Sequence, residues 1–500
     1  MNGLPSELRP APPVPVLRHD GERVAVIGLG ETGVSLVQFL SHRGAAVTAF
    51  DTREDPPGAR AVHARWPELP VQLGPLAEDA LDRADWVALS PGVPRSEPAV
   101  ARALARGAPV IGDVELFARH LPSVAPHART IAITGTNGKS TVTEMAGEMA
   151  RRAGLATVVA GNIGLPVLDA LSEIEDAAAA GQQAVQAVVL ELSSFQLEST
   201  SSLAADAATM LNLSEDHLDR YADMPAYAQA KSRIFTGTGV QVLNRGDAWS
   251  LGMRIEGRVC HTFGVDAPPG AAHWGVLTRD GQPWLAVGDA VLLPTASLPV
   301  PGRHNIANAL AALALGRAVG LPDAPMLEAL CAFRGLPHRM QRIAEVGGVG
   351  YYDDSKGTNV GATVAALDGF PQPVVLIAGG DGKGQDFAPL APVVQRTARA
   401  VVLIGADAPR LAQALAATGV AIENATTLQD AVRRAQAIAL PGDAVVLSPA
   451  CASYDMFRNY VHRAQVFLQS VSALRAPVAG AWPVAAEAPG RAEGGGRRRR

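Results

Sequence analysis

The sequence predicts an α/β protein of three domains. Short apolar runs with strand character alternate with amphipathic runs along most of the 500 residues, as in parallel sheets covered by helices. Glycine-rich turns follow several of these apolar runs, and open α/β sheets bind ligands at that end of their strands. Because single cores stop growing at about 250–300 residues, a chain of this length is expected to divide into domains.

The composition is that of a globular protein, with 48% hydrophobic and 18% charged residues. The net charge of −5 and the lack of a clustered basic face argue against a nucleic-acid-binding protein. Cys260, Cys331 and Cys451 are widely spaced and match neither a disulfide nor a metal pattern, which favours a reducing compartment. No signal peptide and no run of about 18 apolar residues is present, so we expect a cytoplasmic protein without a membrane span.

The first domain opens with a strand at Arg23–Ile27 and the turn GLGETG at Gly28–Gly33. A helix and a second strand follow, and the second strand ends at Asp51, so the run has the G-x-G-x-x-G fingerprint of a Rossmann unit. Alone, this fingerprint predicts NAD. The triplet Asp51-Thr52-Arg53 could equally hold the ribose or base of a mononucleotide sugar, and tight turns that serve packing only are a third reading.

The second domain is built around the phosphate loop, which we define as Gly135–Thr141 with the sequence GTNGKST. A strand at Thr130–Ile133 precedes it and a helix at Val142–Arg152 follows it. This order is typical of a loop whose backbone N–H groups bind phosphates, with Lys139 reaching the terminal phosphates and the Ser140 hydroxyl reaching Mg²⁺. The loop is shorter than the usual P-loop, and a surface turn is the alternative to ATP binding.

Polar side chains follow the next strands of this domain. Asn162, Glu191 and His217 belong to the polar runs in which the expected strands at Thr157–Ala160, Ala187–Leu192 and Ala207–Leu211 end, at the sheet edge that carries the phosphate loop. A carboxylate and an imidazole there are reasonable partners for a metal ion and a substrate, although each residue alone is more often a cap or a surface group.

Two later helices carry further candidates. Lys231 lies within the expected helix Pro225–Phe235, where its spacing alone favours an ordinary solvated lysine. Asn305 and Asn308 lie three residues apart on one face of the expected helix His304–Val319, where they could pair with a base or serve as caps.

A third strand–helix alternation begins after Gly335–Pro337. Its strands end in the runs DDSKGTN, GGDGKGQDF and SPACASYDMF. Lys383, within the second run, precedes another glycine and then an acidic residue, so it suits a carboxylate as well as a phosphate.

The expected domains follow from a Pro/His-containing linker near Leu121–Arg129 and from the boundary at Gly335–Pro337. They are a disordered extension at 1–20, a Rossmann-like domain at 21–126, an ATP-binding domain at 127–336, a second Rossmann-like domain at 337–475, and a disordered tail at 476–500 that includes the run Arg497–Arg500.

Nine motifs resemble those of the Mur ligase family and occur in the family order: GTNGKST, GNIG, ELSSFQLE, EDHLDRY, HNIANALAA, LPHRMQ, DDSKGTN, GGDGKGQDF and SPACAS. The matches run in this order from about Gly28 to Tyr460, so the resemblance extends over nearly all of the chain that is expected to be ordered. The pair GGDGKGQDF and SPACASYDMF discriminates best among family members. No Asp-Asn-Pro-Arg motif is present, which argues against the member that adds meso-diaminopimelate.

The resemblance implies a UDP-binding Rossmann-like domain, a central ATPase domain of P-loop type and a C-terminal Rossmann-like domain that binds an amino acid. It implies ATP-dependent amide formation between UDP-N-acetylmuramoyl-L-alanine and D-glutamate by a monomer with two Mg²⁺ ions. It also resolves the ambiguity of the fingerprint, because the first domain of this family binds UDP rather than NAD.

The resemblance further implies roles for individual residues. The residues expected to bind the UDP substrate are Thr32, Asp51, Thr52, Arg53, Ser90, Gly92, Asn162 and His217. Those expected to bind ATP are Gly135, Thr136, Asn137, Gly138, Lys139, Ser140, Thr141, Asn305, Asn308, Arg339 and Asp354. Those expected to bind D-glutamate are Lys356, Thr358, Lys383, Ser453 and Tyr460. The expected metal ligands are Ser140, Glu191, His217 and a carbamylated Lys231, and the expected catalytic residues are Lys139, His217 and Lys231.

Three other functions compete with this one. A nicotinamide dehydrogenase fused to an ATPase explains GLGETG and GTNGKST but leaves GGDGKGQDF unexplained. A sister ligase that adds another amino acid, or a folylpolyglutamate-type enzyme, shares most motifs, and Tyr454 stands where related enzymes often have an aliphatic residue. A non-catalytic nucleotide sensor would not need the combination of Lys139, Glu191, His217 and Lys231.

Overall fold

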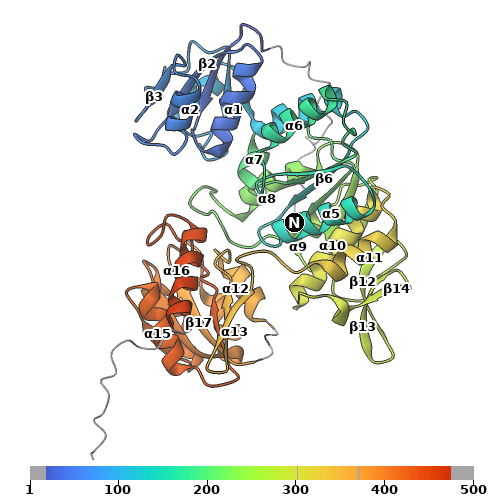
Figure 1. The fold of residues 1–500 in the computed structure, drawn as a ribbon, viewed down its shortest axis with the longest axis vertical. Coiled ribbons are helices and arrows are strands. Elements are labelled where there is room, and N and C mark those ends of the chain that lie inside the picture. The colour runs from blue at the N-terminus through green and yellow to red at the C-terminus, as the bar shows by residue number, and fades with distance from the viewer. Residues whose placement is uncertain (1–18, 301, 369, 371, 475–500) are drawn as a thin grey trace, which may run out of the picture.

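The computed structural model describes residues 19–300, 302–368, 370 and 372–474, whose strands form three separate sheets. Helices cover each sheet, so the expected α/β fold of three units is confirmed. In Figure 1 the N-terminal unit lies at the top, the central unit at the right and the C-terminal unit at the lower left. No helix in the described part of the chain is long and apolar enough to cross a membrane.

The N-terminal sheet has the order β3-β2-β1-β4-β5, and all its strands are parallel. Helices α1 and α2 cover one face and α3 covers the other. The elements are β1 (Arg23–Ile27), α1 (Glu31–His42), β2 (Ala46–Asp51), α2 (Ala59–Arg65), β3 (Val71–Leu73), β4 (Trp86–Leu89), α3 (Pro98–Ala105) and β5 (Val110–Gly112).

The glycines of GLGETG are required by the turn from β1 into α1. Gly28 has φ +93°, a left-handed conformation that disfavours other residues. A Cβ atom on Gly33 would lie 1.7 Å from the carbonyl oxygen of Gly28, so only glycine permits this approach of helix to strand. The turn therefore brings the N-terminus of α1 close to the end of β1.

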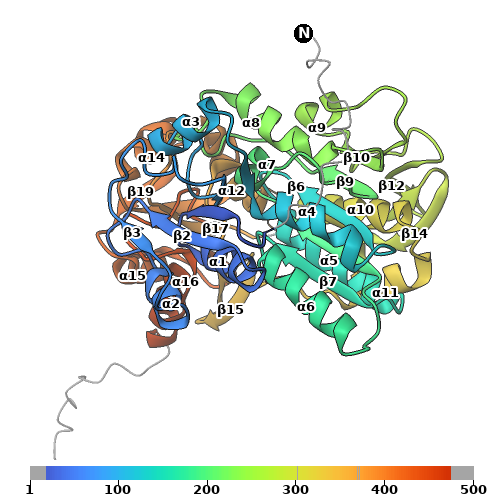
Figure 2. The ribbon, with the colours of Figure 1, turned by 90° about the horizontal axis from the view of Figure 1, so that it is seen from above.

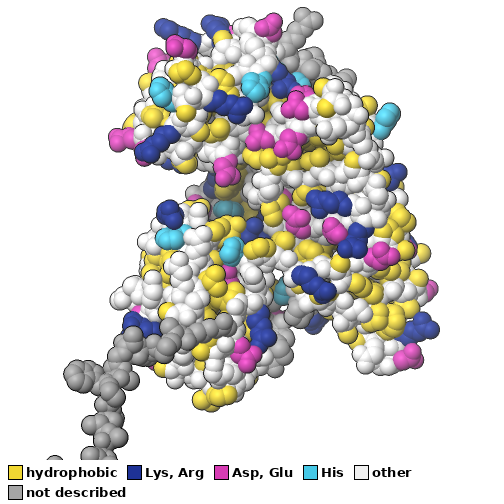
Figure 3. All heavy atoms as spheres, in the orientation of Figure 1, with side chains coloured by type: hydrophobic (Ala, Val, Ile, Leu, Met, Phe, Trp, Pro, Cys, Tyr) yellow, Lys and Arg dark blue, Asp and Glu magenta, His cyan; other side chains and the backbone are white. Residues whose placement is uncertain are grey.

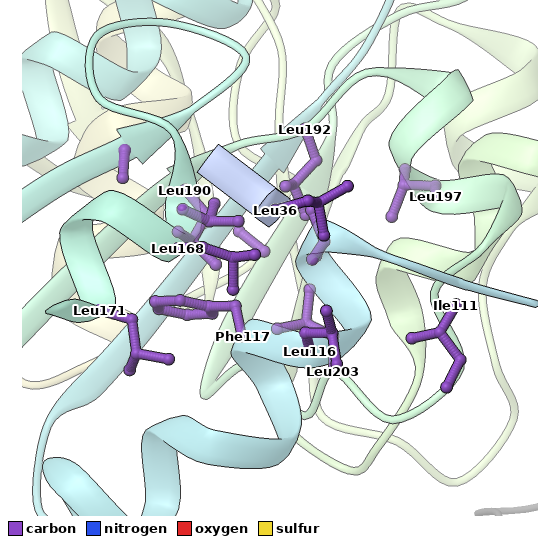
Figure 4. Packing of buried hydrophobic residues seen from close by; sticks show 14 of the residues in the cluster. Leu36, Ile111, Leu116, Phe117, Leu168, Leu171, Leu190, Leu192, Leu197 and Leu203 are labelled. Carbon is purple, nitrogen blue, oxygen red and sulfur yellow. The ribbon is translucent and has the colours of Figure 1, made fainter. Parts of the chain in front are cut away.

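The N-terminal and central units share one hydrophobic core (Figure 4). Leu36 of α1 and Phe117 of α4 (Asp113–Val124) pack in the same cluster as Leu168 of α6 (Val167–Ala179) and Leu190 of β8 (Ala187–Glu191). Arg43, directly after α1, adds an ion pair with Glu175 of α6 at 2.5 Å. The two units are thus joined by apolar packing.

The ends of the N-terminal unit differ from expectation in two details. The linker expected near Leu121–Arg129 is shorter, because α4 continues to Val124 through Pro122 and β6 (Arg129–Thr134) follows, which leaves residues 125–128 between them. His19 was expected in the disordered extension, but it is buried and its Nε2 lies 3.1 Å from Nε2 of His120. The rest of the expected extension, 1–18, and the expected tail lie outside the described residues.

The central sheet has the order β14-β13-β12-β11-β10-β9-β6-β8-β7, parallel from β7 to β12. Its strands are β6 (Arg129–Thr134), β7 (Thr157–Gly161), β8 (Ala187–Glu191), β9 (Ala207–Met210), β10 (Val240–Asn244), β11 (Cys260–Phe263), β12 (His273–Arg279), β13 (Gln282–Val287) and β14 (Ala290–Pro294). Its helices are α5 (Lys139–Arg152), α6 (Val167–Ala179), α7 (Ser194–Glu198), α8 (Met224–Ser232), α9 (Ala248–Gly252), α10 (Arg303–Ala318) and α11 (Asp323–Ala332).

The last three strands of this sheet were not expected from the sequence. They form an antiparallel extension at the edge of the sheet farthest from β7. The turn between β12 and β13 is Asp280-Gly281, with φ of +52° and +73°. An Asp-Gly pair between strand-like runs is a strong hairpin signal, so this feature was readable from the sequence.

The C-terminal sheet has the order β15-β16-β20-β17-β18-β19, with only β15 antiparallel to its neighbour. Its strands are β15 (Gln341–Val346), β16 (Val349–Asp353), β17 (Val374–Gly379), β18 (Ala398–Ile404), β19 (Ala421–Asn424) and β20 (Ala444–Leu447). Helices α12 (Val360–Leu367), α13 (Ala391–Thr397) and α14 (Ala408–Leu415) cover one face, and α15 (Leu428–Ile438) and α16 (Tyr460–Ala473) cover the other.

The C-terminal unit differs from the N-terminal one in how it meets the rest of the chain. Its two hydrophobic clusters contain, among the described residues, only side chains that follow Arg339 in the sequence. Figure 2, seen from above, shows this unit beneath the N-terminal sheet and beside the central one. Its contact with the central unit is made by polar side chains, described below.

The shared core predicts a large loss of stability when Phe117 is shortened. Phe117 is fully buried between the two units, so Phe117→Ala is expected to lower the free energy of unfolding by about 3–5 kcal/mol. Leu468→Ala, on the exposed face of α16, is the matched control with an expected change of about 0.5 kcal/mol or less. Urea titration followed by circular dichroism measures both; equal losses in the two variants would contradict the shared core.

Candidate functional site

The phosphate loop joins β6 to α5 at the centre of the molecule. Gly135 and Gly138 have φ of +151° and +84°, and a Cβ on Gly138 would lie 2.6 Å from Oδ1 of Asn308. Helix α5 begins at Lys139, so its N-terminus faces the loop. Unpaired N–H groups and the helix dipole make such a terminus suited to an anion.

Two lysine amines converge on the carbonyl oxygen of Gly135. Nζ of Lys139 and Nζ of Lys231 each lie 2.9 Å from it, and Lys139 also donates to the carbonyl of Thr136 at 2.8 Å. Burial lowers the pKa of both amines, that of Lys231 well below its ordinary value. Lys231 is only 1% exposed, so the solvated lysine favoured by its spacing is wrong.

Glu191 lies at the end of β8 with one carboxylate oxygen unused. Oε1 accepts a hydrogen bond from Nδ2 of Asn162 at 2.8 Å, whereas the buried Oε2 has no partner within the described residues. A buried carboxylate oxygen without a donor suits a divalent cation. No group of three His, Cys, Asp or Glu side chains in the described chain forms a complete metal cage, so phosphate oxygens and water would have to supply the remaining ligands.

His217 lies at the same sheet edge, in a left-handed conformation with φ +57°. Its ring packs edge-on against Phe195, with the ring centres 4.7 Å apart. Burial lowers the pKa of His217 to about 4, against the opposing effect of Asp216. The imidazole is therefore neutral at pH 7 and keeps a lone pair for a metal ion or a hydrogen-bond donor.

A cavity of about 370 Å³ extends from the phosphate loop to α10 and the C-terminal unit. Nδ2 of Asn308 donates to Oδ1 of Asn305 at 3.3 Å within its wall. The residues expected to bind ATP that line it are Asn137, Gly138, Thr141, Asn305, Asn308, Arg339 and Asp354. The cavity therefore brings together the predicted base, phosphate and ribose ligands.

Asp354 is buried at the C-terminal side of this cavity. Its carboxylate accepts hydrogen bonds from the Ser448 hydroxyl at 2.7 Å and from the backbone N–H of Met340 at 3.2 Å. Burial raises the pKa of Asp354 to about 7, although the Ser448 bond and the Arg339 charge act in the opposite direction. This carboxyl group thus titrates near neutral pH.

A second cavity, of about 700 Å³, is lined by side chains of all three units. Figure 3 shows the surface deeply hollowed between the N-terminal unit above and the C-terminal unit below. The residues expected to bind the UDP substrate that line this cavity are Thr32, Asp51, Thr52, Arg53, Ser90, Gly92 and Asn162. Lys356 and Tyr460, expected to bind D-glutamate, line it from the C-terminal unit.

The contacts of Asp51 weaken the dinucleotide interpretation. One carboxylate oxygen accepts from the backbone N–H of Leu29 at 2.6 Å and from Arg53, and the other also accepts from Arg53. Burial raises the pKa of Asp51, but these hydrogen bonds outweigh it and the pKa lies below its ordinary value. The carboxylate therefore already has donors at both oxygens, whereas the NAD fingerprint needs it for the ribose hydroxyls.

The residues expected to bind D-glutamate are only partly brought together. Nζ of Lys356 lies 5.4 Å from the ring centre of Tyr460, and burial with the nearby Arg339 charge lowers the pKa of Lys356 to about 8. Thr358 and Ser453 line neither of the two cavities. Lys383 forms an ion pair with Asp216 of the central unit.

Sequence reasoning missed Asp216 and Asn359 as site residues. Both are buried where the C-terminal unit meets the phosphate loop, and they are hydrogen-bonded to each other at 3.1 Å. Asp216 lies in the motif EDHLDRY and Asn359 in the motif DDSKGTN. Their position within these motifs could have marked them as site residues, whereas their spacing along the chain could not.

Three family models match the chain in order. They describe a MurD-like N-terminal domain of the Mur ligases at residues 22–112, the Mur ligase middle domain at 133–316 and the Mur ligase glutamate ligase domain at 338–451. The UDP-N-acetylmuramoylalanine–D-glutamate ligase of Methylobacillus flagellatus is 55% identical over 92% of this chain and 99% of its own length. The ligase of the same name from Thiobacillus denitrificans is 56% identical over 92% of this chain and 98% of its own.

Solved structures agree with this fold. MurF of Acinetobacter baumannii aligns with a TM-score of 0.56 at 17% identity, over 89% of this chain and 93% of its own. The UDP-N-acetylmuramate–alanine ligase MurC of Thermotoga maritima aligns with a TM-score of 0.55 at 20% identity, over 90% and 99%.

The raised pKa of Asp354 predicts that nucleotide binding depends on pH. If the ionised carboxylate accepts the ribose hydroxyls, affinity is full above about pH 7 and falls as the group is protonated below it. Between pH 8 and pH 6 the ionised fraction falls about tenfold, and affinity for a non-hydrolysable ATP analogue should fall in proportion.

Calorimetric titration of the wild type and of Asp354→Asn measures this effect. The variant should bind weakly at both pH values, because it lacks the carboxylate. Its affinity should not follow the titration of residue 354, and protonation of the ATP analogue itself affects both proteins alike. Identical pH profiles in the two proteins would contradict the role of Asp354.

Proposed function

The chain belongs to the Mur ligase family, and we propose that it joins D-glutamate to UDP-N-acetylmuramoyl-L-alanine while ATP is converted to ADP and phosphate. Such a ligase acts in the synthesis of peptidoglycan precursors. The observation that carries the proposal is the cavity of about 700 Å³ that runs from GLGETG past Asn162 and Ser193 of the central unit to Lys356 and Tyr460. A sugar nucleotide and an amino acid could meet there beside the nucleotide site.

Identity with named relatives supports the choice of substrate within the family. Relatives named D-glutamate ligases are 50–56% identical over about nine-tenths of this chain and nearly their whole length. Tyr454, the departure from the family pattern, is 76% exposed, so it does not narrow an enclosed pocket. We place the reaction in the cytoplasm, which accords with three unpaired cysteines and with the use of ATP. The proposal also takes the enzyme to be a monomer.

The reaction needs an activated carboxyl group because hydroxide leaves poorly from a carboxylate. One oxygen of the alanyl carboxylate attacks the γ-phosphorus, the bond to the ADP oxygen breaks, and an acyl phosphate forms. The neutral amine of D-glutamate then attacks the acyl carbon. The C–O bond to phosphate breaks, an amide and inorganic phosphate result, and the amine loses a proton. In the first step both reactants are anions, so positioning and positive charge contribute most.

The side chains around the phosphate loop meet this need. Nη2 of Arg339 and Nζ of Lys356 approach the Ser140 hydroxyl at 3.1 Å and 3.3 Å, and Lys139 folds over the loop carbonyls. We assign Lys139 and Arg339 to the charge on the transferred phosphoryl group. Asn305, Asn308 and Asp354 would hold the adenosine part in the smaller cavity.

The residues present fit two Mg²⁺ ions. The unused oxygen of Glu191 and the Ser140 hydroxyl would hold one ion, and the neutral imidazole of His217 would hold the other with a modified Lys231. When bound, Mg²⁺ supplies positive charge to phosphate oxygens. The chain itself orients Glu191 through the hydrogen bond from Asn162.

Carbamylation of Lys231 is part of this proposal. The neutral amine attacks the carbon of CO₂ and releases a proton, so the group must lose its charge first. Its burial and its lowered pKa favour the neutral amine, and the product is an anion that suits a metal ion.

The direct test is phosphate release from ATP with UDP-N-acetylmuramoyl-L-alanine, screening D-glutamate, L-glutamate, L-alanine, L-lysine and meso-diaminopimelate separately. Release with D-glutamate alone is expected. Release with another amino acid would change the assignment within the family, and release with none despite bound ATP would favour a nucleotide sensor.

Carbamylation predicts that activity lost in Lys231→Ala is partly restored by a small carboxylate. Acetate or formate should raise turnover at least about tenfold, because the added anion replaces the carbamate near the metal site. Chloride at equal ionic strength and Lys139→Ala, which loses a cation, are the controls. No rescue, combined with wild-type activity that is unaffected by removal of CO₂, would count against carbamylation.

A further inference from the structure

Asn359, at the start of α12, is hydrogen-bonded directly to the phosphate loop. Its side-chain amide and that of Asn137 form a reciprocal pair, with both N–O distances at 3.1 Å. A Cβ on Gly361 would lie 2.7 Å from Oγ of Ser214 and 3.3 Å from Nδ2 of Asn137, so the first turn of α12 is in close contact with the central unit. The C-terminal unit is thus positioned on the nucleotide-binding loop by a few buried polar groups.

Asp216 connects this contact to Lys383. Its carboxylate is 5% exposed, and its Oδ2 accepts from Nδ2 of Asn359 at 3.1 Å. Its Oδ1 accepts from Nζ of Lys383 and, at 2.9 Å, from the backbone N–H of His217. One carboxylate of the central unit therefore holds two side chains of the C-terminal unit.

The loop that carries Lys383 is itself constrained. Lys383 has φ +51°, and its backbone N–H donates to Oδ1 of Asp381 at 2.9 Å. Asp381 in turn pairs with Ala452 in an isolated antiparallel bridge. The backbone position is set by the C-terminal unit, whereas the end of the side chain is held, among the residues that the structure describes, by Asp216 across the junction.

We propose that Asp216 is a positioning residue for the amino-acid site: it holds the Lys383 ammonium where the carboxylate of the incoming amino acid binds, and through Asn359 it keeps that site in register with the phosphate loop. The inference rests on the proposed function, because it takes Lys383 as a ligand of D-glutamate.

The chemistry of the two groups supports this role. An ammonium group has three donors, so Lys383 can keep its bond to Asp216 while it binds a substrate carboxylate. Without Asp216, a lysine side chain with many rotamers would have to be ordered by the substrate alone, which weakens binding. The same loss would not alter the adenosine cavity, since Asp216 does not line it.

Asp216→Asn separates the contact of Oδ2 from those of Oδ1. The asparagine amide can still offer its oxygen to Nδ2 of Asn359, but its NH₂ group then faces the Lys383 ammonium and the backbone N–H of His217, and two donors cannot pair. We expect the KM for D-glutamate to rise at least about tenfold, the usual scale for a lost hydrogen bond to a charged group. The KM values for ATP and for the UDP substrate should stay within about threefold of those of the wild type.

Asn359→Ser tests the second contact without removing the helix cap. Asn359 accepts from the backbone N–H of Ala362 at the start of α12, and serine is an equally good N-cap. The shorter side chain cannot reach Asn137 or Asp216. We expect the KM values for ATP and D-glutamate to rise together by at least about fivefold, with an unchanged thermal midpoint that establishes folding.

Glu215→Gln is the matched control. This exposed neighbour of Asp216 also crosses the junction, where its Oε2 accepts from the backbone N–H of Asp386 at 3.1 Å, but that bond does not involve Lys383. Its KM for D-glutamate should stay within about twofold of the wild-type value.

The wild type is assayed first, so failure of the proposed function appears as absent activity with D-glutamate before any variant is compared. With an active wild type, a selective rise in the KM for D-glutamate in Asp216→Asn, with the paired rise in Asn359→Ser, supports the proposal. An unchanged KM for D-glutamate in Asp216→Asn, equal changes in Glu215→Gln, or a change confined to the Mg²⁺ dependence would each overturn it. Should Asp216→Asn not fold, Asn359→Ser decides through the second contact: KM values for ATP and D-glutamate that both stay at their wild-type level overturn the proposal, and their paired rise supports it.

Discussion

The convergence of two lysine amines on the Gly135 carbonyl is the interaction on which the site depends. Burial is the largest cause of the lowered pKa values of Lys139, Lys231 and Lys356, and the charge of Arg339 lowers those of Lys139 and Lys356 further. The carboxylate of Glu191 acts in the opposite direction on all three amines. A bound polyphosphate would add negative charge where these buried cations gather.

The two junctions of the central unit have different physical characters. Apolar side chains such as Phe117 and Leu168 form a continuous core with the N-terminal unit, so separating these units exposes hydrophobic surface. The C-terminal junction depends on polar pairs, among them Asn359 with Asn137 and Lys383 with Asp216, which water can replace when they part. We therefore expect domain movement to occur at the C-terminal junction, with the glutamate ligands moving relative to ATP.

Much of the fold could be predicted because strand ends and glycine turns are short-range features of the sequence. The expected ligands of the UDP substrate and ATP came instead from the resemblance to the Mur ligases, and most of them line two cavities. The burial of Lys231 could not be predicted, because it results from packing against Gly135, which is distant in sequence. The partner of Lys383 was missed for the same reason, since no periodicity relates it to Asp216.

In the proposed reaction the alanyl carboxylate meets the γ-phosphate of ATP at the phosphate loop. Substrate with ¹⁸O at both oxygens of the alanyl carboxylate tests this most directly, with ATP and D-glutamate present and mass spectrometry of the released phosphate. Because one carboxylate oxygen bonds to phosphorus and leaves with it, each phosphate should contain one ¹⁸O atom. Unlabelled phosphate, formed together with the amide product, would contradict the acyl phosphate and this arrangement of the site.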